Sequence, residues 1–363
     1  MISSPAVLFS LPGVILSTTP LTSAFPFDWV ALMEATPSSD SEGKDLSRRR
    51  FLKAAALSAA ALAIPTTLNA KGNTARLPRR DFGSTGIKLS IIGMGGIVVR
   101  STEQAHANRL VAEFVERGGN YFDVAPSYGD AELKLAPALK PYRKGSFLAC
   151  KTTERTREGA ERELRQSLER FQTDYFDLYQ LHALIEVGKD VDAVFAKGGA
   201  METFIAARKS GQIRHLGFSA HSVEAALAAM DRYEFDSILF PVNFATFYEG
   251  HFGPQIMEKA KAQGVARLAL KSLARQKWPQ GSTGSTDRAK FPNCWYQPCA
   301  DPREAKLALR FTLSQPVTAA LPPGDETLFR LAVDLAMDFA PITAAETAEL
   351  EALAASLDPL FRA

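Results

Sequence analysis

The sequence predicts an α/β fold, a (β/α)8 TIM barrel with an N-terminal hairpin and a long loop after strand 7. Three observations support this expectation. Short strand-like runs alternate with amphipathic helical stretches along most of the chain, and eight such runs can be counted from Leu89. Ionisable side chains follow three successive runs at their C-terminal ends, where the active site of a parallel barrel lies. The length of 363 residues accommodates one barrel of about 250 residues with extensions.

The strands and helices of the barrel are predicted from periodicity and from turn residues. Gly83 and Gly86 indicate a hairpin, and the first barrel strand is expected at residues 89–99. A doubly wound sheet competes with the barrel, but the turn at residues 93–96 lacks the Gly-x-Gly-x-x-Gly spacing of a dinucleotide-binding sheet. The next strands are expected at residues 120–124, 147–150, 176–181, 215–219, 237–242, 265–270 and 317–321, and helices at 103–117, 157–170, 201–209, 223–233 and 254–263.

Two insertions and a C-terminal segment extend the barrel. Residues 183–199 follow the strand that ends at His182, and residues 272–302 form a long loop after the seventh strand. The aromatic residues of this loop favour either an ordered lid over an apolar pocket or a loop that packs on its own barrel. Residues 341–363 are rich in Ala and predict a helix that covers the barrel. The aromatic residues are Trp278, Phe291, Trp295 and Tyr296.

Composition and cysteine spacing exclude several kinds of partner. The 42 Lys and Arg residues nearly balance 40 Asp and Glu residues, which gives a formal charge of +2, so no nucleic-acid partner is expected. Cys150, Cys294 and Cys299 lack the spacing of a zinc site, and no metal is predicted. Cys294 and Cys299 are interpreted as separate thiols, with a disulfide between them as the alternative in an oxidising compartment.

A basic and apolar stretch near the N-terminus predicts export. Residues 47–53 have the sequence SRRRFLK, and an apolar run at 54–64 and small residues near Ala70 follow. This pattern is typical of a twin-arginine signal peptide, so we expect the twin-arginine export machinery as a partner and a periplasmic or otherwise exported location. The apolar run is too short for a permanent membrane span. A buried Ala-rich helix with a basic start is the alternative.

The expected domain boundaries follow from this signal. Residues 1–46 form an N-terminal extension, and we expect translation to start at Met33, because a signal peptide begins close to its basic region. Residues 47–70 form the signal peptide, residues 77–340 the barrel and residues 341–363 the C-terminal helix.

Four ionisable residues at and after the strand ends suit the reduction of a carbonyl. The carbonyl oxygen gains negative charge when the carbon accepts hydride, so the site needs a proton donor and a polarising group. Tyr128 is the expected general acid, and the charge of Lys151 would stabilise its phenolate. Asp123 would keep Lys151 charged and oriented, and His182 would donate to the carbonyl oxygen. Taken singly, these residues could be a structural ion pair, a loop aromatic and a core histidine.

The same four residues, in this order on consecutive strands, resemble the catalytic tetrad of the aldo-keto reductases. The sequence RDFGSTGIKLS at residues 80–90 also resembles this family, in particular the bacterial group with a twin-arginine signal, and the resemblance extends to about Gly324. It implies an NAD(P)H-dependent oxidoreductase that interconverts an aldehyde or ketone and an alcohol. It also implies NADP or NAD as the cofactor and a small carbonyl compound as the substrate.

The resemblance further implies where the cofactor binds. Ser219 lies where the family has a Ser that holds the nicotinamide carboxamide, although Ala220 replaces the usual Asn. Asn243 is the expected substitute for the family's Gln after the sixth strand. Leu270 stands where many members stack an aromatic ring on the nicotinamide, and Lys271 could reach a phosphate.

The turn after the last strand resembles the phosphate-proximal loop of the family. Gly324 and Asp325 are the expected cofactor-binding residues there. Because Asp325 and Glu326 would repel a 2′-phosphate and could accept hydrogen bonds from ribose hydroxyls, NAD is slightly favoured. Since a twin-arginine signal exports folded proteins, we also expect the mature protein to retain its cofactor under the loop of residues 272–302.

Two alternative functions use the same fold. A non-catalytic barrel could bind a dinucleotide and act as a regulatory subunit. A lyase or aldolase could form a Schiff base with the amine of Lys151 or Lys271 at a strand end. Turnover of the cofactor with carbonyl compounds would separate the reductase from both.

Overall fold

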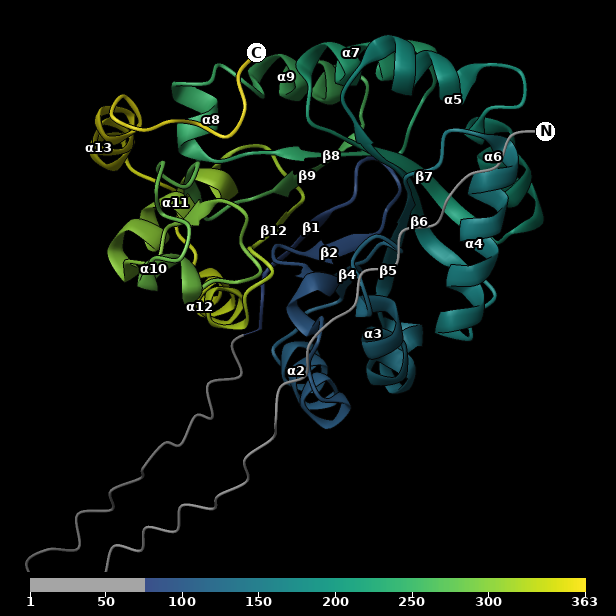
Figure 1. Ribbon diagram of the computed structural model, residues 1–363, viewed down its shortest axis with the longest axis horizontal. Coiled ribbons are helices and arrows are strands. Elements are labelled where there is room, and N and C mark those ends of the chain that lie inside the picture. Colours follow the sequence, from purple (N-terminus) through teal and green to yellow (C-terminus); the bar gives the residue numbers. More distant parts are fainter. Residues whose placement is uncertain (1–75) are drawn as a thin grey trace, which may run out of the picture. The chain divides into compact units, whose positions relative to one another are not determined.

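Eight parallel strands form a nearly closed barrel in the computed structural model, which describes residues 76–363 (Figure 1). The predicted (β/α)8 barrel is confirmed. Backbone contacts join the two ends of the row of strands, because the Gly93 amide donates to the Ala320 carbonyl at 3.0 Å and Ile92 bridges Ala320. In their order around the barrel the strands are β12 (Ala319–Leu321), β9 (Ala266–Leu270), β8 (Ser237–Pro241), β7 (Ile213–Ala220), β6 (Phe176–Leu184), β5 (Phe147–Thr152), β4 (Tyr121–Asp123) and β3 (Met94–Gly95).

The first barrel strand is much shorter than the predicted range of residues 89–99, so that prediction is wrong. The start of the range belongs to β2 (Lys88–Ser90), which pairs antiparallel with β1 (Arg79–Asp81) in the predicted hairpin. Gly93 passes so close to Tyr121 that a β-carbon would lie 2.3 Å from its ring. After β3 the chain enters the 3-10 turn η1 (Gly96–Val99). Gly93 therefore permits a close approach to Tyr121 within an otherwise apolar, strand-like stretch.

The hairpin of β1 and β2 closes the amino end of the barrel. Phe82, in the turn between the two strands, is fully buried, and its ring centroid lies 4.9 Å from that of Phe147 and 5.6 Å from that of His215. This aromatic group covers the apolar residues that fill the barrel, since inward positions alternate along each strand. The filling residues are Leu89, Tyr121, Ala149, Leu178, Leu239, Ala266, Leu268, Ala319 and Leu321.

Helices cover the outside of the barrel and pack their apolar faces against it (Figure 1). The five predicted helices are present as α2 (Gln104–Glu116), α4 (Arg157–Phe171), α6 (Ala200–Ser210), α7 (Val223–Arg232) and α9 (Pro254–Ala262). Side-chain caps begin two of them. Thr156 accepts a hydrogen bond from the Gly159 amide at the start of α4, and Ser222 caps α7 in the same way.

Apart from the two insertions, four further helices of residues 76–363 lie outside the predicted set. Pro137 lies inside one of them, and a proline within a helical stretch argues against a helix when only the sequence is read. Asp301 and Asp325 cap two others, and these caps are start signals that the sequence carries. The four helices are α3 (Ala131–Leu139), α8 (Phe244–Tyr248), α11 (Pro302–Ser314) and α12 (Glu326–Met337).

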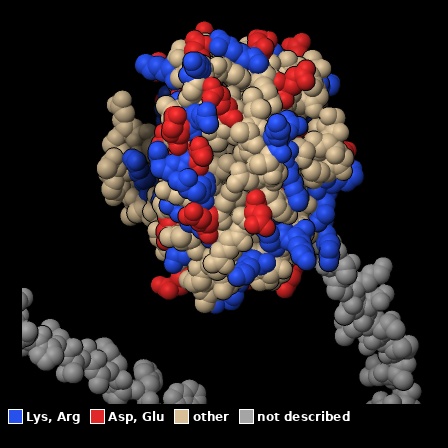
Figure 2. All heavy atoms as spheres, turned by 90° about the vertical axis from the view of Figure 1, so that its right-hand side faces the viewer, with Lys and Arg blue, Asp and Glu red and all other residues tan. Residues whose placement is uncertain are grey.

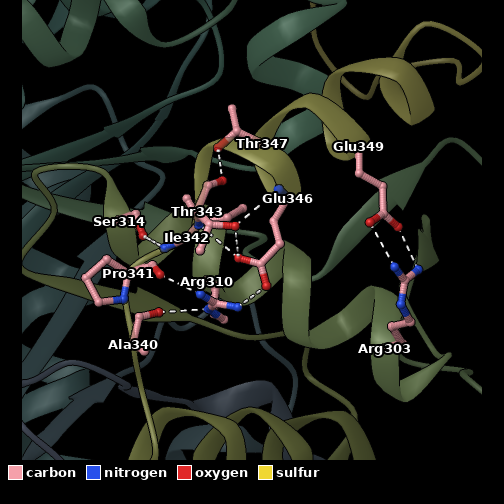
Figure 3. Close-up of polar contacts among 10 residues, drawn as sticks. All are labelled: Arg303, Arg310, Ser314, Ala340, Pro341, Ile342, Thr343, Glu346, Thr347 and Glu349. Carbon is pink, nitrogen blue, oxygen red and sulfur yellow. Dashed lines mark hydrogen bonds and ion pairs between the residues drawn. The ribbon is translucent and has the colours of Figure 1, made fainter.

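The C-terminal helix is α13 (Ala344–Ala354), which is shorter than the predicted segment. Two arginines of α11 hold it in place (Figure 3). Arg303 donates two hydrogen bonds to Glu349, at 2.6 and 2.8 Å, and Arg310 pairs with Glu346. Arg310 also donates to two backbone carbonyls just before the helix. This clamp anchors the last part of the chain on the side of the barrel.

Both insertions contain secondary structure. The insertion after β6 forms the π-helical turn η3 (Val187–Asp192) and the short helix α5 (Ala193–Phe195). In the loop after β9, β10 (Ala274–Gln276) pairs antiparallel with β11 (Gln297–Pro298), and α10 (Thr286–Ala289) lies between them in the chain. These insertions follow strand ends, so they lie at the carboxyl end of the barrel.

Charges of both signs are mixed on the surface. Figure 2 shows Lys and Arg side chains interspersed with Asp and Glu on the face that it presents. Within residues 76–363, no helix combines the length and apolar character needed to cross a membrane.

Cys294 and Cys299 are free, buried thiols, as expected from the first of the two alternatives. The predicted extension, signal peptide and start at Met33 lie outside the described residues.

Candidate active site

All four residues predicted for catalysis meet at the carboxyl end of the barrel. Asp123 ends β4, and Tyr128 lies on the loop that follows it. Lys151 and His182 lie near the ends of β5 and β6. The ends come together because β4 pairs in parallel with β5, and β5 with β6.

Lys151 is the centre of this group. Its ammonium donates to Asp123 Oδ1 and lies 3.3 Å from the Tyr128 hydroxyl and 3.4 Å from the Val124 carbonyl. Lys151 and Asp123 are each 1% exposed, so each charge is stabilised by the other rather than by water. Burial alone would lower the pKa of Lys151, but the charges of Asp123 and Tyr128 outweigh it and raise that pKa. Lys151 therefore stays protonated.

Two buried polar side chains that the sequence interpretation missed hold Asp123. Gln180 Nε2 donates to Asp123 Oδ2 at 3.0 Å, and the Tyr121 hydroxyl donates to the same oxygen at 3.3 Å. Gln180 precedes His182 by two residues, and Tyr121 precedes Asp123 by two. Residues two apart on a strand share a face, so this period is the signal that could have found them.

Tyr128 keeps its proton at neutral pH. Burial raises the pKa of its hydroxyl above the ordinary value, and the charge of Lys151 acts in the opposite direction. The Lys151 ammonium also lies 5.0 Å from the centre of the Tyr128 ring. A phenolate formed here would therefore face a fixed cation, which is what a tyrosine needs to act as an acid.

His182 lies beside Tyr128 and is neutral. The two rings meet edge to face, with centroids 5.7 Å apart and an interplanar angle of 82°. Burial and the charge of Lys151 lower the pKa of His182 to about 2. Ser127 Oγ lies 3.4 Å from His182 Nδ1. An imidazole whose Nδ1 accepts from Ser127 carries its proton on Nε2, from which it can donate to a substrate oxygen.

A second group of side chains lies at the ends of β7 and β9. Lys271 is 8% exposed, and its ammonium lies 3.3 Å from His221 Nε2. The same ammonium lies 5.5 Å from the ring centroids of both Trp295 and Phe361. Burial and the charge of Lys151 lower the pKa of Lys271 to about 7, and burial and Lys271 lower the pKa of His221 to about 3. His221 and Phe361 were not predicted as site residues.

The model of the aldo/keto reductase family matches residues 91–353. The chain belongs to this family. The match includes the four residues around Lys151 and the strand ends that carry them. Aldo/keto reductases are NAD(P)-dependent oxidoreductases, and membership does not favour the regulatory barrel or the Schiff-base enzyme as alternatives.

Related proteins carry oxidoreductase names. L-galactose dehydrogenase of Arabidopsis thaliana is 26% identical over 268 residues, which are 66% of this chain and 81% of the relative. Aldo-keto reductase YhdN of Bacillus subtilis is 27% identical over 216 residues, 53% of this chain and 61% of the relative. The uncharacterized oxidoreductase YqkF of Bacillus subtilis is 30% identical over 156 residues, 39% of this chain and 48% of the relative. The matched segment thus spans about half the length of YqkF.

Solved structures share the fold. The aldo-keto reductase AKR11C1 from Bacillus halodurans, in its holo form, is 23% identical, with a TM-score of 0.59 over 77% of this chain and 96% of that one. A putative aldo-keto reductase from Pseudomonas aeruginosa is also 23% identical, with a TM-score of 0.57 over 73% of this chain and 96% of that one. At this identity the likeness shows the barrel architecture.

Ser219 and Asn243, which are expected to hold the nicotinamide, each make one hydrogen bond within the fold. Ser219 Oγ accepts a hydrogen bond from the Ala183 amide at 2.8 Å. Asn243 caps α8, because its Oδ1 accepts from the Thr246 amide at 2.9 Å. Asn243 Nδ2 and Ser272 Oγ are buried without a hydrogen-bond partner among the described residues. Free polar groups at strand ends fit a ligand as polar as a dinucleotide.

The two carboxylates after β12 are already engaged. Asp325 caps α12 by accepting a hydrogen bond from the Leu328 amide at 3.1 Å. Glu326 contacts His106 at 2.5 Å and Arg330 at 2.9 Å. These contacts reduce the capacity of Asp325 and Glu326 to accept hydrogen bonds from a ribose, on which the expected NAD preference depended.

The loop after β9 reaches across to other strand ends. Asn293 Nδ2 donates to the Gly324 carbonyl at 3.3 Å, and Asn293 Oδ1 accepts from Arg100 Nη2 at 2.6 Å. Gly324 in turn lies so close to Ile97 that a β-carbon would be 2.3 Å from its side chain. The loop is thereby fastened to the segments after β3 and β12, and these contacts fit both alternatives for this insertion, an ordered lid and a loop that packs on its own barrel.

Proposed function

We propose that this enzyme interconverts an aldehyde or ketone and the corresponding alcohol, with Tyr128 as the general acid in the reducing direction. The observation that carries the proposal is the position of Lys151, whose ammonium pairs with Asp123 and lies 3.3 Å from the Tyr128 hydroxyl. A buried cation in this place lowers the free energy of the phenolate. NAD(P)H supplies the hydride.

The other residues of the group handle charge on the carbonyl oxygen. Neutral His182 donates a hydrogen bond to that oxygen and directs the carbonyl toward Tyr128. Tyr128 gives up its proton as the oxygen becomes an alkoxide, and Lys151 stabilises the negative charge left on the phenol. Asp123, held by Gln180, keeps Lys151 in place. In the oxidising direction the phenolate accepts the proton of the alcohol.

Replacement of Tyr128 tests this proposal. Tyr128→Phe removes the acid but keeps the ring, so carbonyl reduction should fall by at least about 100-fold, the scale of general acid catalysis. Cofactor binding and the melting temperature should stay close to parental. Tyr233→Phe, outside the site after α7, serves as the control and should retain parental turnover. Parental rates for Tyr128→Phe on small aldehydes would overturn the assignment.

We propose that the ends of β7, β8 and β9 hold the cofactor. Ser219 and the free Nδ2 of Asn243 would bind the nicotinamide carboxamide, and Leu270 would contact the ring. Lys271 and the turn at residues 324–325 would lie near phosphate groups. The buried, unpaired Nδ2 of Asn243 supports this assignment, because a buried donor without a partner is costly unless a ligand satisfies it. Asn243→Asp should weaken cofactor binding, measured by fluorescence titration.

We propose that NAD(H) is accepted as well as NADP(H). Recognition of a 2′-phosphate needs a free cation or amide. Arg330, the arginine closest in sequence to the turn, already pairs with Glu326 at 2.9 Å and with Glu113 at 2.5 Å. Titration with both reduced cofactors tests this preference, and a strong preference for NADPH would overturn it.

We propose that the protein is exported through the twin-arginine pathway with its cofactor retained. The sequence of residues 47–70 supports export, and the contacts of Asn293 support a lid that slows release of the ligand. Dialysis of the mature protein, followed by denaturation, should release nicotinamide cofactor. A clean apo-protein that rebinds cofactor only at micromolar levels would rule out retention and leave the reductase assignment intact.

A further inference from the structure

The backbone next to His182 adopts an unusual conformation. Ala183 has a φ of 55°, in the left-handed region that residues with a side chain rarely adopt. This residue lies near the end of β6, where the pairing with β7 becomes irregular. A conformation of this kind persists only where the surroundings hold it, and it is frequent at functional sites.

Arg155, on the segment after β5, holds this backbone. Its Nη2 donates to the carbonyls of His182, at 2.8 Å, and of Ala183, at 3.3 Å. Its Nη1 donates to the Thr153 carbonyl at 3.2 Å, and its Nε donates to Asp190 Oδ1 at 2.9 Å. All three nitrogens of the guanidinium are therefore used, and four acceptors fix its plane.

Asp190 holds the backbone that follows Ala183. Its Oδ2 accepts hydrogen bonds from the amides of Ile185 and Glu186, both at 2.8 Å. The side chains of Arg155 and Asp190 are 19% and 18% exposed, so their ion pair is shielded more than most surface pairs. The Ala183 amide supplies another anchor through its 2.8 Å hydrogen bond to Ser219.

Among residues 76–363, the ring of His182 has one polar contact and one aromatic contact. Ser127 Oγ lies at 3.4 Å, a long distance for a hydrogen bond, and Tyr128 meets the ring edge to face. The position of the imidazole therefore depends on where the His182 backbone is held. A displacement of about 1 Å in a reacting group can cost about 100-fold in rate.

We infer that Arg155 is a positioning residue that acts through His182. By binding the carbonyls of His182 and Ala183, Arg155 sets the distance and angle at which the imidazole donates to the carbonyl oxygen of the substrate. The inference rests on the proposed function of His182 as that donor. The insertion after β6 then helps to position His182, because Asp190, which orients Arg155, belongs to η3.

The first experiment combines Arg155→Met with His182→Ala. Arg155→Met alone should lower kcat by about 10- to 100-fold, with little change in the Kd of the cofactor. In the His182→Ala background, which has already lost the donor, the same change should have almost no further effect. Arg155→Lys should fall between the parent and Arg155→Met, because one ammonium cannot hold two carbonyls and a carboxylate in a plane.

Arg232→Met is the matched control. Arg232 pairs with Asp192, at the far end of η3, at 2.5 Å. Its loss weakens the attachment of the same insertion at a point remote from the carbonyls of His182 and Ala183. We expect near-parental kcat for Arg232→Met, and an equal loss in both variants would show that general loosening of the insertion is responsible.

Two further outcomes would overturn the inference. Losses from Arg155→Met and His182→Ala that multiply in the double variant would show that Arg155 does not act through His182. A parental kcat for a folded Arg155→Met would show the same. If Arg155→Met does not fold, Asp190→Asn replaces it in the cycle with the same expected coupling. A harmless Tyr128→Phe would instead contradict the proposed function, so the two failures can be told apart.

Discussion

At the scale of single residues, two lysines at the mouth of the barrel differ in how their charge is supported. Lys151 has the carboxylate of Asp123, and its pKa is raised. Lys271 contacts neutral His221 and two aromatic rings, and no carboxylate among residues 76–363 pairs with it. Its pKa falls to about 7 as a result of burial and the charge of Lys151. Lys271 is therefore available to bind an anionic group that the chain does not supply.

This difference predicts how pH affects the stability of the protein without cofactor. An unfolded lysine has a pKa of about 10.4, so between pH 7 and pH 10 the unfolded chain binds a proton that folded Lys271 does not. The free energy of unfolding therefore increases as pH rises through this window and decreases as pH falls toward 7. Lys271→Gln should melt at a higher temperature than the parent at pH 7, and the gap should close toward pH 10.

Thermal melts of both proteins across this pH range measure the effect. Groups that titrate in both proteins cancel in the difference. A constant difference in Tm between the two proteins would show that Lys271 keeps an ordinary pKa. The same variant should bind NAD(P)H more weakly, because the proposed phosphate contact is lost.

At the scale of elements, the end of α4 is less stable than the sequence could make it. Gln172 caps this helix with a φ of 49° and a ψ of 45°, the left-handed conformation that glycine adopts most easily. Gln172→Gly should raise the free energy of unfolding by about 0.5–1 kcal/mol, since relief of the left-handed conformation exceeds the entropy that glycine adds to the unfolded chain. The hydrogen bond from Lys140 to Gln172 is exposed and contributes little.

Denaturant unfolding checks this prediction, with Gln172→Ala as the control. Alanine also loses the contact with Lys140 but keeps the backbone strain, so it should be no more stable than the parent. If the alanine variant gained as much as the glycine variant, the side chain of Gln172 rather than its backbone would be responsible.

The elements that sequence reasoning found are those with a local signal. α4 has a period of apolar residues and a Thr156 cap, and Asp123, Lys151 and His182 stand where apolar strands end. The strand that contains β3 was predicted too long, because the close approach of Gly93 to Tyr121 is a tertiary contact that the local pattern does not contain. Arg155 was missed for a related reason, since its main partners lie on the neighbouring strand β6 and on the insertion that follows it.

At the scale of the whole molecule, the C-terminus completes the mouth of the barrel. The clamp of Arg303 and Arg310 holds α13 (Figure 3). The chain then runs to Ala363, whose amide donates to the Gly250 carbonyl at 2.9 Å. On the way Phe361 stacks on His221, with centroids 5.0 Å apart and an interplanar angle of 11°. No local pattern could link residue 361 to strand ends so far away in sequence.

Removal of residues 361–363 should therefore change the site without unfolding the barrel. The clamp on α13 stays intact, but the Phe361 ring also pairs with Phe252 and Trp295, so stability should fall by about 2–4 kcal/mol, the scale of three lost aromatic pairs. Water would then reach Lys271, which lies 5.5 Å from the Phe361 centroid, and its pKa should move back toward the ordinary value. The pH-dependent difference in Tm between the parent and Lys271→Gln should shrink when both carry the truncation. Arg362→Ala, which removes the contacts of Arg362 with Glu249 but leaves the Phe361 ring, should preserve that difference. A truncated pair that keeps the full pH-dependent difference would show that the barrel itself, rather than its C-terminus, shields Lys271.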